Sequence, residues 1–196
     1  MDTPGTRHSH GLEQFFASFG GSQGLRVLDL GGACQENITY ITSLGHRLSS
    51  EDFLRTLENV FGEGDFYSNQ QREDLVDLFT EQVLDFEQGY FDGVLVWDTL
   101  QYLSPKLLQM TLHQLHSILR PGALMLSFFH TDEKATTAPM LNFRIQDSRT
   151  LTLASRGIRK PAQFFNNREL ERLFGQYHST KFFLTRDNLR EVIVRR

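Results

Sequence analysis

The sequence predicts an α/β fold, a doubly wound and mostly parallel sheet with helices on both faces. Three observations predict it. Short apolar runs at 26–30, 91–97 and 123–129 are typical of buried parallel strands. Amphipathic segments with helical spacing separate these runs, and the connections between them are short, as in β–α–β crossovers. The chain has 196 residues, the length of one domain, so we expect a single domain over 1–196.

The first half of the chain is expected to alternate helix and strand. Residues 1–10 are small and polar, so we expect them to be disordered. An N-terminal helical segment is expected over 11–24, with Leu12, Phe15 and Phe16 on one face and glycines breaking it after Phe19. The next elements are a strand at 26–30, a helix that passes through Ile38, Ile41 and Leu44 and stops at Gly45, a polar strand at 46–50 and a helix over 53–61.

The second half continues this alternation and then changes character. Helices are expected around 75–79 and 107–119, strands at 91–97 and 123–129, and a very short third strand at 82–84. Alternating apolar residues predict a hairpin, so 140–168 is read as an inserted hairpin or cap segment. Asn166 and Glu169 have the spacing of a capping box that starts a helix. An antiparallel strand pair at 180–185 and 190–194 is expected to close the fold.

Composition argues against several classes of protein. Cys34 is the single cysteine, so no intrachain disulfide can form, and no Cys/His spacing predicts a metal site. No run of about 18 apolar residues predicts a membrane span, and residues 1–10 lack an apolar signal stretch. We therefore expect a cytoplasmic protein. The net charge of −4, without a basic stripe, argues against nucleic acid as a partner.

Charge is unevenly distributed along the chain. Residues 51–98 hold thirteen acids and two bases, a local charge of −11, and residues 144–172 hold seven bases and three acids, a local charge of +4. Charged side chains usually stay at the surface, so both segments can be plain solvated faces. The basic segment alternatively indicates an anionic substrate near it.

The turn after the first strand is the main candidate site. Asp29, Gly31 and Gly32 follow the apolar run, and a helix N-terminus after such a turn offers free N–H groups to an anion. Asp52 lies 23 residues after Asp29, at the predicted end of the second strand, where an acid can accept hydrogen bonds from ribose hydroxyls. Each signal alone is also compatible with an ordinary strand-to-helix turn.

In their order and spacing, five motifs resemble the class I S-adenosylmethionine-dependent methyltransferases, over about half of the chain (25–129). They are the turn Asp29-Leu30-Gly31-Gly32-Ala33-Cys34-Gln35, the pair Gly45-His46, Asp52, the strand Phe91-Asp92-Gly93-Val94-Leu95-Val96-Trp97, and Leu119-Arg120-Pro121-Gly122-Ala123. The resemblance implies a Rossmann-like, seven-stranded sheet with a terminal antiparallel strand and S-adenosyl-L-methionine as cofactor. The chain departs from the family's glycine motif at Ala33 and Gln35. The family's third-strand motif, which usually ends in an acid near the adenine, is not recognisable, and Thr80, Glu81 and Val83 occupy that region.

The resemblance also implies roles for particular residues. The Gly31-Gly32 turn would hold the methionine moiety, positioned by Asp29, and Asp52 would hold the ribose. The full set of expected cofactor-binding residues is Asp29, Gly31, Gly32, Ala33, Asp52, Val83 and Trp97. The candidates for catalysis are Asp98, Tyr102 and His130, at the ends of the fourth and fifth strands. Three of these residues have a plainer alternative: Trp97 can be core, Asp98 an N-cap, and His130 a structural or solvated side chain.

The sequence thus favours a methyltransferase acting on a small molecule, with the segment at 142–172 capping the site. The alternative is a non-catalytic binding module on the same fold, because fold does not imply function. A partner surface that replaced the pocket would show as an occluded or shallow pocket. A nicotinamide-dependent oxidoreductase is a weaker alternative, since the turn lacks Gly-x-Gly-x-x-Gly. The substrate and the oligomeric state stay open.

Overall fold

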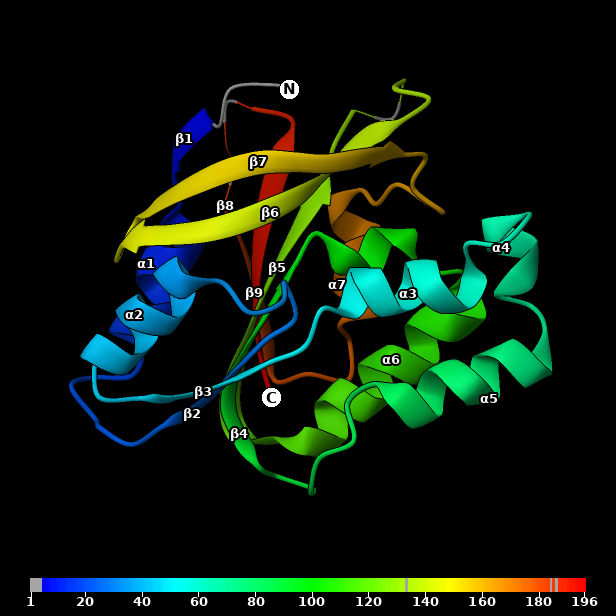
Figure 1. Ribbon diagram of the computed structural model, residues 1–196. Coiled ribbons are helices and arrows are strands. Elements are labelled where there is room, and N and C mark those ends of the chain that lie inside the picture. Colours follow the sequence, from blue (N-terminus) through cyan, green and yellow to red (C-terminus); the bar gives the residue numbers. More distant parts are fainter. Residues whose placement is uncertain (1–4, 133, 184, 186) are drawn as a thin grey trace.

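Over the residues that the structure describes, the main sheet has six strands in the order β3-β2-β4-β5-β9-β8 (Figure 1). The computed structural model describes residues 5–132, 134–183, 185 and 187–196. The strands β3 (Arg47–Ser50), β2 (Arg26–Asp29), β4 (Phe91–Trp97) and β5 (Leu119–His130) are parallel. The closing strands β9 (Leu189–Arg195) and β8 (Ser179–Phe183) each run antiparallel to the preceding neighbour in that order. The predicted α/β fold is confirmed in this mixed form.

The predicted third strand at 82–84 is wrong, and with it the count of seven strands. Helix α5 (Glu73–Gln82) includes Gln82 itself. Leu84 then has a φ of 56°, and its N–H points to the two carboxylate oxygens of Glu51 at 3.2 and 3.1 Å. A residue with this backbone conformation, and with its donor on a side chain, does not join a sheet ladder.

Helices cover both faces of the main sheet, as predicted. One face packs against α3 (Phe53–Phe61), α5, α6 (Pro105–Ile118) and α7 (Asn167–Leu173), with the short α4 (Phe66–Asn69) beside them. The other face packs against α1 (His10–Ala17) and α2 (Gln35–Ser43). Because side chains alternate along a strand, Val94 and Val96 of β4 enter the first core and Leu95 and Trp97 the second. The 3-10 turn η1 (Thr99–Tyr102) follows β4.

A second sheet of three antiparallel strands lies across one end of the main sheet (Figure 1). Its strands are β1 (Gly5–His8), β7 (Thr150–Arg159) and β6 (Ala138–Asp147), in the order β1-β7-β6. The pair β6 and β7 is the predicted hairpin, and we call residues 138–159 the arm. The capping box of Asn166 and Glu169 is also present, at the start of α7.

The N-terminal predictions need correction. Residues 5–8 are not disordered: they form β1, whose backbone pairs with residues 150–153 of the arm, and α1 already begins at His10. The pairing satisfies backbone groups that the sequence left without an evident partner. Helix α1 ends at Ala17 rather than near residue 24, since Gly20, Gly21 and Gly24 all have positive φ. The prediction of disorder for residues 1–4 lies outside the described residues.

Candidate functional site at the carboxyl edge of the main sheet

Asp29, at the end of β2, is fully buried and bound by groups of the chain itself. Its Oδ1 accepts hydrogen bonds from the Gly31 N–H at 2.8 Å and from the Trp97 indole N–H at 2.6 Å. Its Oδ2 accepts one from the Asn37 amide at 2.7 Å. Burial raises the pKa of Asp29, and the three donors only partly offset that effect. The carboxylate therefore fixes the turn, the β4 end and α2 to one another.

The Trp97 indole lies directly against the predicted cofactor turn. Trp97 has a φ of 58°, which aims its side chain back over β2, and only 1% of the residue is exposed. A Cβ on Gly31 would lie 2.9 Å from the indole Cδ1 and Nε1, so only glycine fits there. On its other side the indole stacks on Phe143 of the arm, with ring centroids 4.8 Å apart and planes 10° apart. The packing of Trp97 is thus sufficient to explain Gly31.

Asp52 is paired with the arm. Its carboxylate accepts hydrogen bonds from both terminal nitrogens of Arg156, at 2.9 and 3.3 Å, and caps α3 through the Arg55 N–H. Gly32 has a φ of 86°, and a Cβ on it would lie 3.1 Å from the Asp52 Cβ. The acid expected to hold a ribose is therefore held by a guanidinium of the same chain.

The other residues of the predicted motif lie outside this cluster. Ala33 is exposed, Val83 is buried just after α5, and Cys34 precedes α2 as its N-cap residue. Gln35, where the chain departs from the glycine motif, is exposed on α2 and donates to Thr39 one turn further along. The side chain packed against the glycine turn is Trp97, not Gln35.

The basic arm meets acids of the helices that flank the edge. Besides Arg156 on Asp52, Arg159 is 3.4 Å from Glu58 of α3 and Arg144 is 3.1 Å from Glu36 of α2. The Asn37 amide also donates to the Phe143 carbonyl and its oxygen accepts from the Ile145 N–H. Three bases of the segment at 144–172 are thus paired with acids of the same molecule.

The three candidates for catalysis come together where β6 begins. His130 Nε2 is 3.0 Å from the Pro139 carbonyl, which also accepts the Tyr102 hydroxyl at 3.2 Å. Asp98 Oδ2 is 3.9 Å from His130 Nε2 and accepts the Leu141 N–H at 3.1 Å. The predicted N-cap bond of Asp98 is absent, since its side chain caps nothing in η1.

Fewer of the polar side-chain atoms around Asp98 have hydrogen-bond partners than around Asp29. Asp98 is fully buried, and burial raises the pKa of its carboxyl. Among the described residues, its Oδ1 and the amide nitrogen of Gln101 have no hydrogen-bond partner. An unpartnered buried polar atom of this kind is uncommon in folded proteins and calls for an explanation such as a bound water, ion or ligand.

A cavity of about 360 Å³ lies in front of this cluster, between the arm and the start of β9. That volume falls in the range of small-molecule sites, at the lower end of roughly 300–1,000 Å³. Its lining combines apolar residues with a few polar groups, the usual composition of a ligand site. The polar groups are His130, Asp132, Thr137, Asp187 and Asn188, and the apolar ones include Leu141, Leu153 and Phe164.

Sequence reasoning missed the residues that the arm brings to this edge. Arg156 lies 104 positions from Asp52, Phe143 lies 46 positions from Trp97, and the Phe143 carbonyl lies 106 positions from the Asn37 amide that donates to it, so no local pattern links these partners. The one available signal was the basic composition of residues 144–172, which pointed to an anionic partner without saying that the partner lay in the same chain.

Comparison with solved structures places the fold. The chain is similar to a 1,6-didemethyltoxoflavin N1-methyltransferase from Burkholderia thailandensis, solved with its substrate and S-adenosylhomocysteine, with a TM-score of 0.52 and 16% identity over 95% of this chain and 76% of that one. It is similar to S-adenosylmethionine-dependent methyltransferases from Methanosarcina mazei (TM-score 0.52, 12% identity, 89% and 93% covered) and Archaeoglobus fulgidus (0.51, 14%, 94% and 91%).

These likenesses show that the chain has the fold of the class I S-adenosylmethionine-dependent methyltransferases. No family model matches the sequence, and no curated protein matches it. In the part of the chain that the structure describes, no helix is long and apolar enough to span a membrane.

Proposed function

We propose that this chain is a non-catalytic, small-molecule-binding protein with the methyltransferase fold. The observation that carries the proposal is that its own side chains fill the predicted cofactor site. Trp97 packs on Gly31 at the turn where the methionine moiety is expected, and Arg156 pairs with Asp52 where the ribose is expected. In this conformation the residues present do not fit S-adenosylmethionine.

Opening the site would be expensive, which supports the proposal. Lifting the arm would expose Phe143, Ile145 and Leu151, all buried, at about 1.5–3 kcal/mol for each side chain. A ligand with a Kd of 1 μM has about 8 kcal/mol of binding free energy. Displacing the arm would therefore consume most of the binding free energy of an ordinary cofactor.

The cavity beside His130 is the proposed ligand site. It lies at the carboxyl end of β5, whose last residue is His130, at the edge where open α/β sheets bind ligands. Asp98 and Gln101, which carry the unpartnered polar atoms, bind two residues of the lining: Asp98 accepts the Leu141 N–H and Gln101 accepts the His130 N–H. A small molecule with an apolar body and one or two hydrogen-bonding groups matches such a lining.

The second candidate is a small-molecule methyltransferase that uses S-adenosyl-L-methionine. One specific observation favours it: the Asp29-to-Gly32 turn and Asp52 stand together at the ends of neighbouring parallel strands and form a bridge between Gly31 and Asp52. That is the arrangement the family resemblance implies. This candidate requires the arm to move and Arg156 to release Asp52.

Calorimetric titration with S-adenosylmethionine and S-adenosylhomocysteine separates the two candidates. The proteins to compare are wild type, Asp52→Ala and Arg156→Ala, each checked for folding by circular dichroism. We expect no binding to any of them. Micromolar binding to wild type that weakens at least about tenfold in Asp52→Ala, equal to about 1.4 kcal/mol, would instead establish the methyltransferase. Binding gained only in Arg156→Ala would also overturn the proposal, because it would reveal an intact site that the arm covers.

The cavity itself is tested with a panel of small metabolites in a thermal-shift assay. The matched control is Ala135→Trp, which fills the cavity from a loop and leaves the sheet unchanged. A true ligand raises the unfolding temperature of wild type and not that of Ala135→Trp. Equal shifts in both proteins would place the binding elsewhere.

A further inference from the structure

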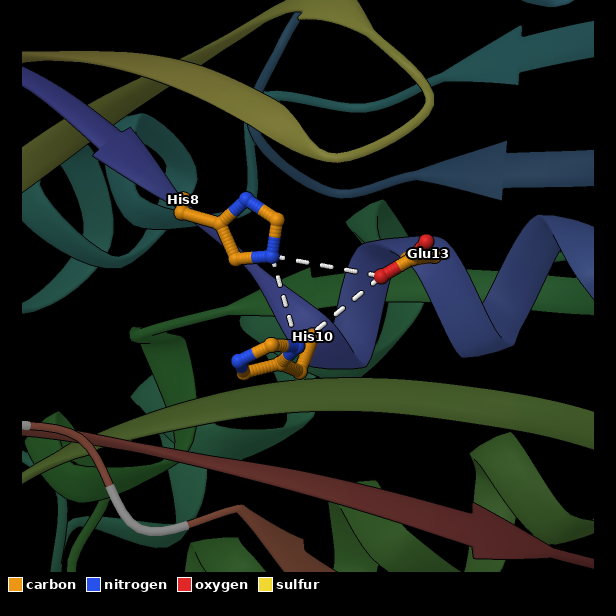
Figure 2. Close-up of side chains that lie close together, drawn as sticks. All are labelled: His8, His10 and Glu13. Atoms are coloured by element: carbon orange, nitrogen blue, oxygen red, sulfur yellow. Dashed lines mark hydrogen bonds and ion pairs between the residues drawn. The ribbon is translucent and has the colours of Figure 1, made fainter.

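Three side chains with metal-binding groups meet on the surface where β1 joins α1 (Figure 2). His8 ends β1, and His10 and Glu13 lie one turn apart on α1, on the face that His8 approaches. His8 Nε2 is 3.3 Å from His10 Nδ1 and 3.9 Å from Glu13 Oε2, and His10 Nδ1 is 3.8 Å from the same Glu13 oxygen. The sequence did not predict this group, because His8 and His10 lie in a segment that was expected to be disordered.

The spacing of the three atoms suits a tetrahedral metal ion. Ligand atoms about 2.0–2.2 Å from such an ion lie roughly 3.3–3.6 Å from one another. The observed separations exceed this by a few tenths of an ångström at most, and all three side chains are about half exposed, so small rotations can close the gap. Two imidazoles and a carboxylate form a common zinc ligand set, with water in the fourth position.

The backbone that carries these side chains is held rigidly. Ser9, between the two histidines, is fully buried, and its N–H donates to the Arg149 carbonyl at 2.7 Å. Its hydroxyl donates to Glu191 at 3.0 Å and accepts the Leu12 N–H, which caps α1. The His10 ring also stacks on Phe183, with centroids 6.4 Å apart. A preorganised group of ligands loses little conformational entropy when an ion binds.

We propose that His8 Nε2, His10 Nδ1 and Glu13 Oε2 bind one divalent transition-metal ion, with Zn²⁺ as the representative ion. Imidazole nitrogen favours zinc and its neighbours in the first transition row over Mg²⁺ and Ca²⁺, which prefer all-oxygen sites. The bound ion would tie the end of β1 to the first turns of α1. It would thereby stabilise the pairing of β1 with the arm, because an ion that binds only the folded chain shifts folding toward that state.

The test is a calorimetric titration of the full chain, without an affinity tag, with Zn²⁺ and separately with Mg²⁺. We expect one Zn²⁺ per chain and no Mg²⁺ binding. His8→Ala, His10→Ala and Glu13→Gln should each weaken Zn²⁺ binding at least about tenfold, since each removes one of three protein ligands. Glu13→His keeps a ligand at that position and should bind more tightly than Glu13→Gln.

Control variants decide between a specific site and scattered surface binding. His178→Ala removes an exposed histidine that follows α7 and lies outside the proposed site. His116→Ala breaks the pair of His113 and His116 on α6, which are three residues apart like His10 and Glu13 but include no carboxylate. Neither should change Zn²⁺ affinity. Absence of Zn²⁺ binding to wild type, or equal losses in His8→Ala and His178→Ala, would overturn the proposal. Unfolding temperatures without metal verify that the variants are folded, and the Zn²⁺-dependent rise in that temperature should occur in wild type and disappear in His8→Ala.

Discussion

The two halves of the carboxyl edge differ in how completely the chain fills them. At the ends of β2 and β3, the indole of Trp97 packs on the turn at Gly31 and the guanidinium of Arg156 pairs with Asp52. The Asp29 carboxylate accepts hydrogen bonds from three donors. At the end of β5 a cavity remains, and nearby Asp98 keeps one oxygen without a partner among the described residues. The first half is built as core, and the second has the properties of a binding site. The arm contributes to both halves: it packs on Trp97 and Asp52 in the first and lines one side of the cavity in the second.

Truncating a side chain in each half should give the largest contrast. Trp97→Ala removes a fully buried ring that touches Asp29, Gly31 and Phe143, and should lower the free energy of unfolding by about 3–5 kcal/mol. Leu153→Ala, at the half-buried lining of the cavity, should cost only about 1 kcal/mol. Urea unfolding of both variants measures the difference. A smaller loss for Trp97→Ala than for Leu153→Ala would show that the filled half is not core.

One substitution made in both halves should have opposite effects. Asp29→Asn brings an amide N–H₂ against the Asn37 amide, which is fixed by its own bonds to Phe143 and Ile145, and should destabilise by about 1–3 kcal/mol. Asp98→Asn keeps an acceptor for the Leu141 N–H and removes a buried charge, so it should stabilise by about 1 kcal/mol. Denaturation midpoints at neutral pH decide this, and a loss of stability in both variants would contradict it.

The gain from Asp98→Asn should depend on pH. Burial raises the pKa of Asp98 in the folded state above its ordinary value of 3.8, so the folded chain holds this proton more tightly than the unfolded chain. This group therefore favours folding at acid pH, and that contribution is lost as the pH rises from the unfolded pKa to the folded one. The stability difference between Asp98→Asn and wild type should be largest at neutral pH and shrink toward pH 3.8. A difference that does not change with pH would mean that the Asp98 carboxyl has the same pKa in the folded and the unfolded chain.

The smallest expected effect is that of Arg156→Ala on stability. The Arg156–Asp52 pair is partly exposed, with 15% and 34% of the two side chains accessible, so its loss should cost only about 0.5–1 kcal/mol and less in high salt. Thermal unfolding at low and high ionic strength checks this. A loss of several kcal/mol would mean that Arg156, rather than the aromatic packing around Trp97, holds the arm down.

The main sheet could be predicted well because its signals are local. The runs at 26–30, 91–97 and 123–129 are apolar on both faces, as expected for strands covered by helices on both sides. The strand predicted at 82–84 is wrong because the Leu84 N–H donates to the side chain of Glu51, which lies 33 residues earlier in the chain. The strand at 5–8 was not predicted because its partner, residues 150–153, lies far away in the sequence, where no local pattern can reveal the pairing.

The sequence predicts where the candidate site lies, but not whether the site is open to a ligand. Asp29, Gly31 and Asp52 were found from the turn and the spacing, and Asp98, Tyr102 and His130 do meet at one carbonyl. Whether the turn is open depends on the backbone of Trp97, whose positive φ is rare for such a large residue and leaves no mark in the sequence. The occupation of Asp52 depends on Arg156, 104 residues further on.

The pairing of β1 also determines the order in which parts of the chain can fold during synthesis. Arg7 is buried against Glu191, which lies 184 residues later, and residues 5–8 pair with the arm. During synthesis, these early residues leave the ribosome long before their partners exist, so they must wait while the middle of the chain folds. Contacts between residues so far apart in sequence form slowly. The first described residues should therefore reach their places last, and a chain stopped before Glu191 would leave the charge of Arg7 without its buried partner.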